Sequence, residues 1–420
     1  MSSVAQRLAV PGGTALGAVV RDGAYRRLWV SGFCLNTARW MDMVLLGWLA
    51  LQLTGSPFMV GLAAFARSAP TMLLGPFAGV VADRVHRGRV LLLTQGLGLA
   101  AAAALAAVFA SGRGAYWPLL ALTALFGIVW ALDFPARRTA LYALVGPGRT
   151  ATAVSLETVS MQLGKIIGPV AAGIGLAKLS PGHCYAAVAA CYAIGLAVTF
   201  ALRSRIATPR PSAPSPVVAT LGAGIRAAWE EPTIRAVLAI TILMNVLVFP
   251  YQPMLAVFAR QVLNAGPEWL GALVAADGLG SLVGALVIAS RRGFLPYRRV
   301  FAGAVIVVPV LLALLAGARW PWACVGILLL MGAVESGFAT MQSTLVLLSA
   351  PENRRGGAMG ILSACIGTGP IGALALGLVA GGIGVAWAMA INGAVALAGI
   401  APLARGLWRR PPPPAGDLGR

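Results

Sequence analysis

Twelve apolar runs, each long enough to cross a bilayer, constrain this chain more than any other feature of its sequence. A membrane-spanning helix needs about 20 predominantly apolar residues, and the runs form two sets of six with a polar stretch between them. Only 10% of the 420 residues are charged, whereas a soluble domain carries about 25%. The runs lie at about 28–53, 57–82, 89–111, 116–137, 151–177, 183–202, 233–260, 268–290, 299–317, 322–348, 357–380 and 383–404.

The predicted fold class is an all-α membrane protein with twelve transmembrane helices in two pseudo-symmetric six-helix bundles. Residues 141–173 and 345–377 favour a duplicated unit, because each segment runs through a Pro and a basic loop into a helix with a Gly-Pro pair. The predicted parts are an N-terminal tail, a first bundle, a linker, a second bundle and a C-terminal tail, at 1–27, 28–202, 203–232, 233–404 and 405–420.

Basic residues predict the orientation of the spans. If the N-terminus is cytoplasmic, the cytoplasmic segments hold 25 of the 32 Lys and Arg residues. The external loops then hold Arg113, Lys178, Arg260 and Arg319, and three more basic residues lie within spans. Because cytoplasmic loops of membrane proteins are enriched in Lys and Arg, we expect a multi-pass protein of a bacterial inner membrane with both termini and the linker in the cytoplasm.

The same features exclude several other classes of protein. The net charge of +20 is explained by the positive loops rather than by nucleic-acid binding. The five cysteines are scattered without a C-x-x-C pair, so we expect no disulfide and no metal site. The sequence has no Walker motif and neither H-E-x-x-H nor G-x-S-x-G, which predicts no enzyme activity and no cofactor. Arg7 and the break at 11–13 predict a cytoplasmic tail rather than a signal peptide.

The loop after the second apolar run carries a recognisable motif. Residues 79–92 read GVVADRVHRGRVLL, which resembles the loop between helices 2 and 3 of the major facilitator superfamily, G-x-L-A-D-R-x-G-R-[RK]-x-x-L. The resemblance makes this loop the expected inner gate, with Gly79, Asp83, Arg84, Arg87 and Arg89 as its residues. His86 and Gly88 depart from the pattern.

Other stretches narrow the resemblance to one branch of that superfamily. RWMDMVLLGWLALQLTGSPFMVGL, ARSAPTMLLGPFAGVVADR, LDFPARRTALYALV and LGAGIRAAWEEPTIR are similar to the enterobactin-exporter-like transporters, also called transmembrane secretion effectors. The resemblance implies proton-driven efflux of a siderophore, drug or other amphipathic small molecule through a cavity lined by helices 1, 4, 7 and 10. It also implies a monomer whose partners are its substrate and the lipid bilayer.

Ionisable residues inside apolar spans are costly and usually functional. In the N-terminal half these include Arg39, Asp42, Arg67 and Lys165. Arg39 and Asp42 are spaced i,i+3 and can share a helix face, so we expect one of the two arginines to be available for an acidic substrate. We expect Asp133 and Arg137 to be solvated near the cytoplasmic end of their span. Together with Glu157, they could largely cancel the remaining charge of the N-terminal half.

The C-terminal half carries two mid-span carboxylates, Glu335 and Asp277, with no basic residue at comparable depth in that half. A carboxylate in a low-dielectric environment favours its protonated form, so Glu335 is the first candidate for the coupling acid, with Asp277 and Asp42 as alternatives. Asn245 is a further polar candidate, for the cavity or for an interhelical hydrogen bond. The alternative for Glu335 and Asp277 is a structural role, in which each carboxyl stays protonated and hydrogen-bonded.

Two other functions fit the same sequence. One is a facilitator or importer of a small solute, which would exchange substrate independently of pH. The other is a sensor or scaffold with a transporter fold, which would tolerate neutralisation of every mid-span charge. The sequence leaves the substrate open.

Overall fold

The computed structural model is helical, and it contains no strand among the residues that it describes. The described residues are 12–84, 86–202, 222, 225–226, 229–291, 296–351 and 354–409, without the side chains of 12–16, 75–84 and 147. Most of the predicted linker and the outer part of each predicted tail lie outside this description. The predicted N-terminal tail includes a helix, α1 (Gly12–Arg21), and the first turn of the next.

The chain divides into two compact units. Unit 1 comprises Met1–Leu46 and Ala66–Ala213, and unit 2 comprises Gly47–Phe65 and Pro214–Arg420. The first six long helices are α2 (Gly23–Thr54), α3 (Pro57–Arg84), α4 (Arg87–Ala110), α5 (Tyr116–Val145), α6 (Thr150–Lys178) and α7 (Pro181–Leu202). They are followed by α9 (Pro232–Leu243), η3 (Met244–Val248), α10 (Tyr251–Gln261), α11 (Pro267–Ser290), α12 (Tyr297–Gly317), α13 (Pro321–Ser349), α14 (Arg355–Ile366), α15 (Gly369–Ile383) and α16 (Val385–Arg409).

Eleven segments of the described chain are long and apolar enough to cross a membrane. They coincide with the predicted runs from the second to the twelfth. The first predicted run lies on α2, which is also helical and long but is not among the eleven. This helix carries two candidate site residues, Arg39 and Asp42, within its span, and their charge makes the span more polar.

Local sequence signals explain where many helices begin. Proline, which has no N–H to leave unsatisfied at the first helical position, starts α3, α7, α9, α11 and α13. Asp22 caps α2, because its Oδ1 accepts hydrogen bonds from the amides of Ala24 and Tyr25 at 2.9 and 3.2 Å. Glu231 caps α9 in the same way by accepting from the amide of Thr233.

Two of the predicted spans are interrupted near their middle. The seventh contains η3, one turn of π-helix between α9 and α10, and the eleventh is broken between α14 and α15 at residues 367–368. The interruptions adjoin, since a Cβ atom on Gly372 of α15 would lie 2.3 Å from the carbonyl oxygen of Val246 in η3. The side chain of Asn392 donates to the carbonyl of Leu247 at 3.0 Å, which satisfies one of the backbone groups released by the distortion.

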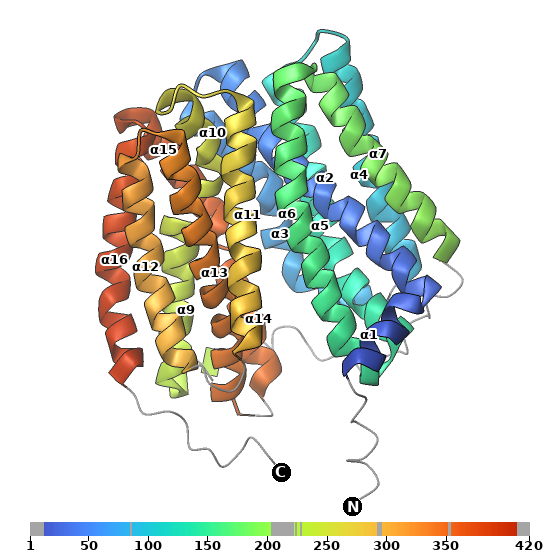
Figure 1. Ribbon diagram of the computed structural model, residues 1–420, viewed down its shortest axis with the longest axis vertical. Helices are drawn as coiled ribbons and strands as arrows, with labels where there is room; N and C mark the ends of the chain where they lie inside the picture. Colours follow the sequence, from blue (N-terminus) through green and yellow to red (C-terminus); the bar gives the residue numbers. More distant parts are fainter. Residues whose placement is uncertain are drawn as a thin grey trace, which may run out of the picture. The chain divides into compact units, whose positions relative to one another are not determined.

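The helices α11 and α13 of unit 2 pack side by side along a row of glycines (Figure 1). A Cβ atom on Gly280 would lie 1.9 Å from the carbonyl oxygen of Leu329, and one on Gly284 would lie 2.2 Å from that of Ala333. On the facing helix, a Cβ atom on Gly332 would lie 2.0 Å from the carbonyl oxygen of Asp277. The absence of side chains at these glycines therefore allows the two backbones to touch.

Substituting Gly332 by Ala is expected to lower the melting temperature of the purified protein, because the new methyl group would push α13 away from α11. Gly326→Ala is the matched control on the same helix, since a Cβ atom there has no neighbour within 4 Å. That change should leave the melting temperature unchanged or raise it, because Ala is favoured over Gly in helices by about 1 kcal/mol. Equal melting temperatures for the two variants would contradict the close approach of the helices.

Glycines also bring α6 of unit 1 against α2. A Cβ atom on Gly164 would lie 2.8 Å from Cβ of Asn36, and one on Gly168 would lie 2.7 Å from the carbonyl oxygen of Thr37. Elsewhere in unit 1, α4 packs against α5 and α7 (Figure 1). This packing places the ionisable residues of α2, α5 and α6 close together.

Candidate functional site

The carboxylates Glu335 and Asp277 gather around one tyrosine of unit 2. Glu335, midway along α13, is 7% exposed, and its Oε1 accepts a hydrogen bond from the Tyr251 hydroxyl at 3.2 Å. Tyr251, at the start of α10, interacts electrostatically with both Glu335 and Asp277. The side chain of Asp277 lies over Gly332, one turn before Glu335, where the glycine row brings α11 against α13. The two acids that the sequence treats as alternatives therefore belong to one site.

Asn245 lies in η3, and its side chain bonds within its own helical segment. Its Nδ2 donates to the carbonyl oxygen of Thr241 at 2.9 Å, so the expected interhelical hydrogen bond from Asn245 is not what the structure shows. The interhelical bond here comes from Gln342 of α13, whose Nε2 donates to Thr241 Oγ1 at 2.5 Å. The π-helical turn accounts for the difference, because it changes the direction in which this part of the helix presents its side chains.

Asp42 forms a buried ion pair with Arg67 rather than with Arg39. The Nε of Arg67 on α3 donates to Asp42 Oδ2 at 2.7 Å, and both side chains are buried. The hydroxyl of Tyr185 on α7 donates to the other carboxylate oxygen at 3.5 Å. The i,i+3 spacing lets Arg39 and Asp42 share a helix face, but the guanidinium that bonds to the carboxylate comes from the neighbouring helix.

Arg39 instead lies against aromatic rings. Its guanidinium carbon is 3.5 Å from the centre of the Trp130 ring on α5 and 5.9 Å from that of Trp40. The Nζ of Lys165 on α6 lies 5.3 Å from the centre of the same Trp40 ring. A cation over an aromatic face is stabilised without losing its charge, so Arg39, Lys165 and the two tryptophans form a cationic aromatic surface.

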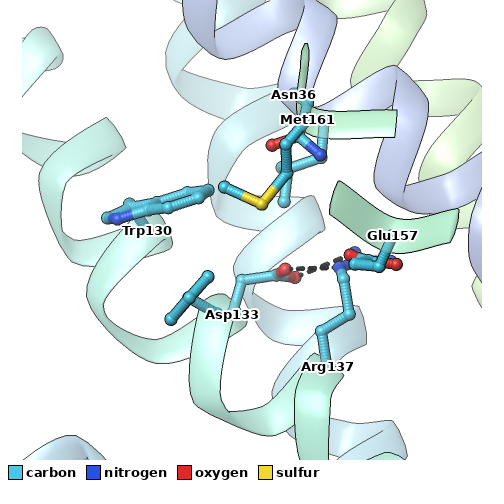
Figure 2. Close-up of a pocket in the computed structure, with 8 residues that line it drawn as sticks. Asn36, Trp130, Asp133, Arg137, Glu157 and Met161 are labelled. Carbon is cyan, nitrogen blue, oxygen red and sulfur yellow. Dashed lines mark hydrogen bonds and ion pairs between the residues drawn. The ribbon is translucent and has the colours of Figure 1, made fainter. Parts of the chain in front are cut away.

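A second buried charge group occupies the same unit, and it consists of Asp133, Arg137 and Glu157. Arg137 donates from Nε and Nη2 to the two oxygens of Asp133, at 2.8 and 3.2 Å. Glu157 of α6 is 6% exposed and lies beside Arg137, next to a small cavity that Trp130 also lines (Figure 2). The expected proximity of Asp133 and Arg137 is confirmed, but the expected solvation is wrong, since Asp133 is 0% exposed.

The predicted inner gate lies at the junction of α3 and α4. The backbones of Gly79, Asp83 and Arg84 belong to the last turns of α3, and their side chains lie outside the description. Arg87 begins α4 and donates to the carbonyl oxygen of Thr139 on α5 at 3.3 Å, whereas Arg89 is exposed. The gating role of Asp83 stays a prediction.

The described residues contain no group of three or more His, Cys, Asp or Glu side chains that could hold a metal ion. The carboxylates in both units instead lie beside hydroxyl groups or guanidinium groups, which are partners for proton binding and ion pairing. The chemistry that these sites offer is reversible protonation and recognition of charge.

The family described as transmembrane secretion effector matches residues 14–409. The multidrug efflux pump Tap of Mycolicibacterium fortuitum is 25% identical over 354 residues, which cover 82% of this chain and 86% of that protein. The staphyloferrin A transporter of Staphylococcus aureus is 25% identical over 260 residues, which cover 61% of this chain and 65% of that relative, slightly under two thirds of its length.

Solved transporters share the fold at low sequence identity. A bacterial homologue of the human lysosomal transporter Spinster has a TM-score of 0.70 at 13% identity, covering 94% of this chain and 100% of the other. The nucleoside transporter NupG has a TM-score of 0.72 at 15% identity, covering 93% and 100%. Because the family match spans most of the chain, this multi-pass membrane protein belongs to the transmembrane secretion effector family of major facilitator transporters, and not to a family of enzymes.

Proposed function

We propose that this protein exports an amphipathic small molecule from a bacterial cytoplasm by exchanging it for protons. The observation that carries the proposal is the burial of Glu335 and Asp277 around Tyr251 in the middle of unit 2. Neither α11 nor α13 contains Lys or Arg, and a tyrosine hydroxyl donates a hydrogen bond without supplying a formal charge. A carboxyl in such surroundings can take up and release a proton during a transport cycle.

The comparisons support the outward direction. The family is described as secretion effectors, and Tap is an efflux pump for several drugs. The relative that transports staphyloferrin A supports a siderophore as one class of cargo. We therefore assign the cargo to siderophores, drugs or related amphipathic compounds, with the protonmotive force as the energy source. One charge moved through the membrane potential is worth about 2.3 kcal/mol per 100 mV.

The proposed architecture has twelve spans, with α2 as the first and the interrupted segments at Pro232–Gln261 and Arg355–Ile383 as the seventh and eleventh. Two six-helix bundles would give alternating access to the cargo, as transporters with internal repeats do. Both termini and the linker would lie in the cytoplasm, because the positive charge of the loops follows that orientation. The protein would act as a monomer in the inner membrane.

The cationic aromatic surface of unit 1 is the proposed contact for the polar group of the cargo. Substituting Arg39 by Gln should weaken export of the anionic dye carboxyfluorescein more than export of the cationic dye ethidium. The expected difference is about tenfold to a hundredfold, because a hydrogen bond to a charged group is worth about 1.5–3 kcal/mol. Arg67, the other predicted candidate, is committed to Asp42.

Export of the two dyes by the Arg39 variant is measured in cells and normalised to the amount of protein in the membrane. Arg113→Gln is the matched control, because it removes the same charge at an exposed position between α4 and α5. Equal losses for the two dyes would make Arg39 a structural cation.

The proposed function is tested with inside-out membrane vesicles from cells that express the protein. An imposed gradient, acidic inside, should drive uphill accumulation of ethidium or carboxyfluorescein, and a protonophore should abolish it. Vesicles with the empty vector set the background. Exchange of either dye that is independent of pH would make the protein a facilitator. Transport of neither dye, together with tolerance of every mid-span neutralisation, would overturn the proposal in favour of a scaffold.

A further inference from the structure

The group formed by Asp133, Arg137 and Glu157 contains two carboxylates but one buried guanidinium. Arg137 is largely engaged, since its Nε and Nη2 bond to Asp133, and its Nη1 donates to the carbonyl oxygen of Leu28 at 3.1 Å. Both terminal nitrogens also lie 3.4 Å from Ser31 Oγ. The Oε2 atom of Glu157 is buried without a hydrogen-bond partner among the described residues.

The other titratable or charged groups near Glu157 do not replace that guanidinium. Arg138 acts on it from an exposed position on α5, where water screens the charge. Tyr25 of α2 also faces Glu157, but its hydroxyl donates to the carbonyl oxygen of Ala153 at 3.2 Å. Cys34 of α2 interacts electrostatically with Arg137 and is not among the groups that act on Glu157.

A small cavity lies beside the group. The cavity has a volume of about 10 Å³, about what a single water molecule needs. Figure 2 shows Glu157, Arg137 and Asp133 along its wall, with Trp130, Met161 and Asn36 around the remainder. The carboxyl of Glu157 thus lines a space that can hold one water molecule, a partner for proton exchange.

A glycine of α2 keeps Glu157 and Arg137 next to each other. A Cβ atom on Gly32 would lie 3.2 Å from Glu157 Oε1 and 3.3 Å from Arg137 Nη1. Both side chains therefore occupy the space that the missing methyl group leaves on α2. A shift of Arg137 between Asp133 and Glu157 would therefore change the contacts of α2, α5 and α6 together.

We propose that Glu157 is a second proton-binding site, in unit 1 and separate from Glu335. This inference rests on the proposed function for its role in transport. With Glu157 protonated, Asp133 and Arg137 form a neutral pair and the whole group carries no net charge. When the proton passes from the carboxyl to a cavity water, Glu157 becomes a buried anion, and Arg137 turns from Ser31 and Asp133 toward it. Proton release thereby changes the contacts among three helices.

The test is infrared spectroscopy of the full chain in lipid, which separates the carbonyl stretch of a protonated carboxyl from the bands of a carboxylate. We expect a protonated component at neutral pH that disappears on alkalinisation. Glu157→Gln should remove it and should reduce by one the number of protons that each molecule releases over the same pH interval. In Asp133→Asn, which frees Arg137 for Glu157, the component should already be absent at neutral pH.

Glu335→Gln is the control that separates this inference from the proposed function. It should leave the Glu157 component in place, whether or not it stops transport. Loss of transport in Glu335→Gln with an unchanged spectrum in Glu157→Gln would overturn the inference and leave the proposed function standing. If Glu157→Gln fails to fold, Asp133→Asn decides, since a protonated component at neutral pH as large as that of the unsubstituted protein would equally overturn it.

Discussion

Glu335→Gln is expected to abolish uphill, pH-driven efflux while it leaves downhill exchange of the same dye measurable. Gln keeps the size of the side chain and can still meet the Tyr251 hydroxyl, which lies 3.2 Å from Glu335 Oε1, but it cannot bind and release a proton. Accumulation against a gradient should fall to the level of protein-free liposomes. The measurement is dye flux in proteoliposomes, with and without an imposed pH gradient.

Asp277→Asn is the informative comparison, because Asp277 interacts with the same tyrosine. If Glu335 carries the proton, the Asp277 variant should retain part of the pH-driven flux, and Tyr251→Phe should slow it without uncoupling it. Undiminished coupling in Glu335→Gln, with coupling lost in Asp277→Asn, would move the role to Asp277. Undiminished coupling in both variants would remove this site from the mechanism.

Neutralising either partner of the Asp42–Arg67 pair should destabilise the protein strongly. Removing one member of a buried ion pair leaves the other charge buried alone, which costs about 3–5 kcal/mol. That is a large share of the 5–15 kcal/mol that typically stabilises a folded protein. Asp42→Asn and Arg67→Gln should therefore each lower the melting temperature and the yield of protein from the membrane.

The double variant Asp42→Asn/Arg67→Gln distinguishes structure from coupling. Two neutral amides can bond to each other in place of the ion pair, so the double variant should recover most of the melting temperature that each single variant loses. Arg113→Gln, at an exposed position, serves as the control for loss of one positive charge. If the double variant is stable and still couples dye efflux to protons, Asp42 is a structural residue. If it is stable but uncoupled, Asp42 shares the role proposed for Glu335.

The positions of the helices follow from the sequence because spanning length and the hydrogen-bonding needs of a buried backbone leave few alternatives. The interruptions do not follow in the same way. The turn at 244–248 adopts π-helical geometry next to Gly372 on α15, a contact between segments more than a hundred residues apart. The row of glycines on α11 and α13, by contrast, can be seen in the sequence of each helix, but only the structure shows which backbone each glycine faces.

Which charges meet is less predictable, because it depends on the rotation of each helix about its own axis. Arg39 and Asp42 share a face of α2 by spacing, but Arg67 on α3 takes the carboxylate. Asp133 and Arg137 pair at the i,i+4 spacing that predicts them, and groups on α2 and α4 bond to the buried pair. Two carboxylates and one arginine in neighbouring spans were a signal for the site at Glu157. The sequence does not show that Asp133 occupies most of the guanidinium.

The central claim, exchange of cargo for protons, is tested most directly by proton movement that the cargo itself induces. Proteoliposomes are held without any imposed gradient, and the dye that the protein transports, ethidium or carboxyfluorescein, is added outside. Its entry should drive protons outward, so the weakly buffered medium should acidify, and this response should vanish with a protonophore or in Glu335→Gln. Entry of the dye at the same rate with no change in external pH would contradict the account.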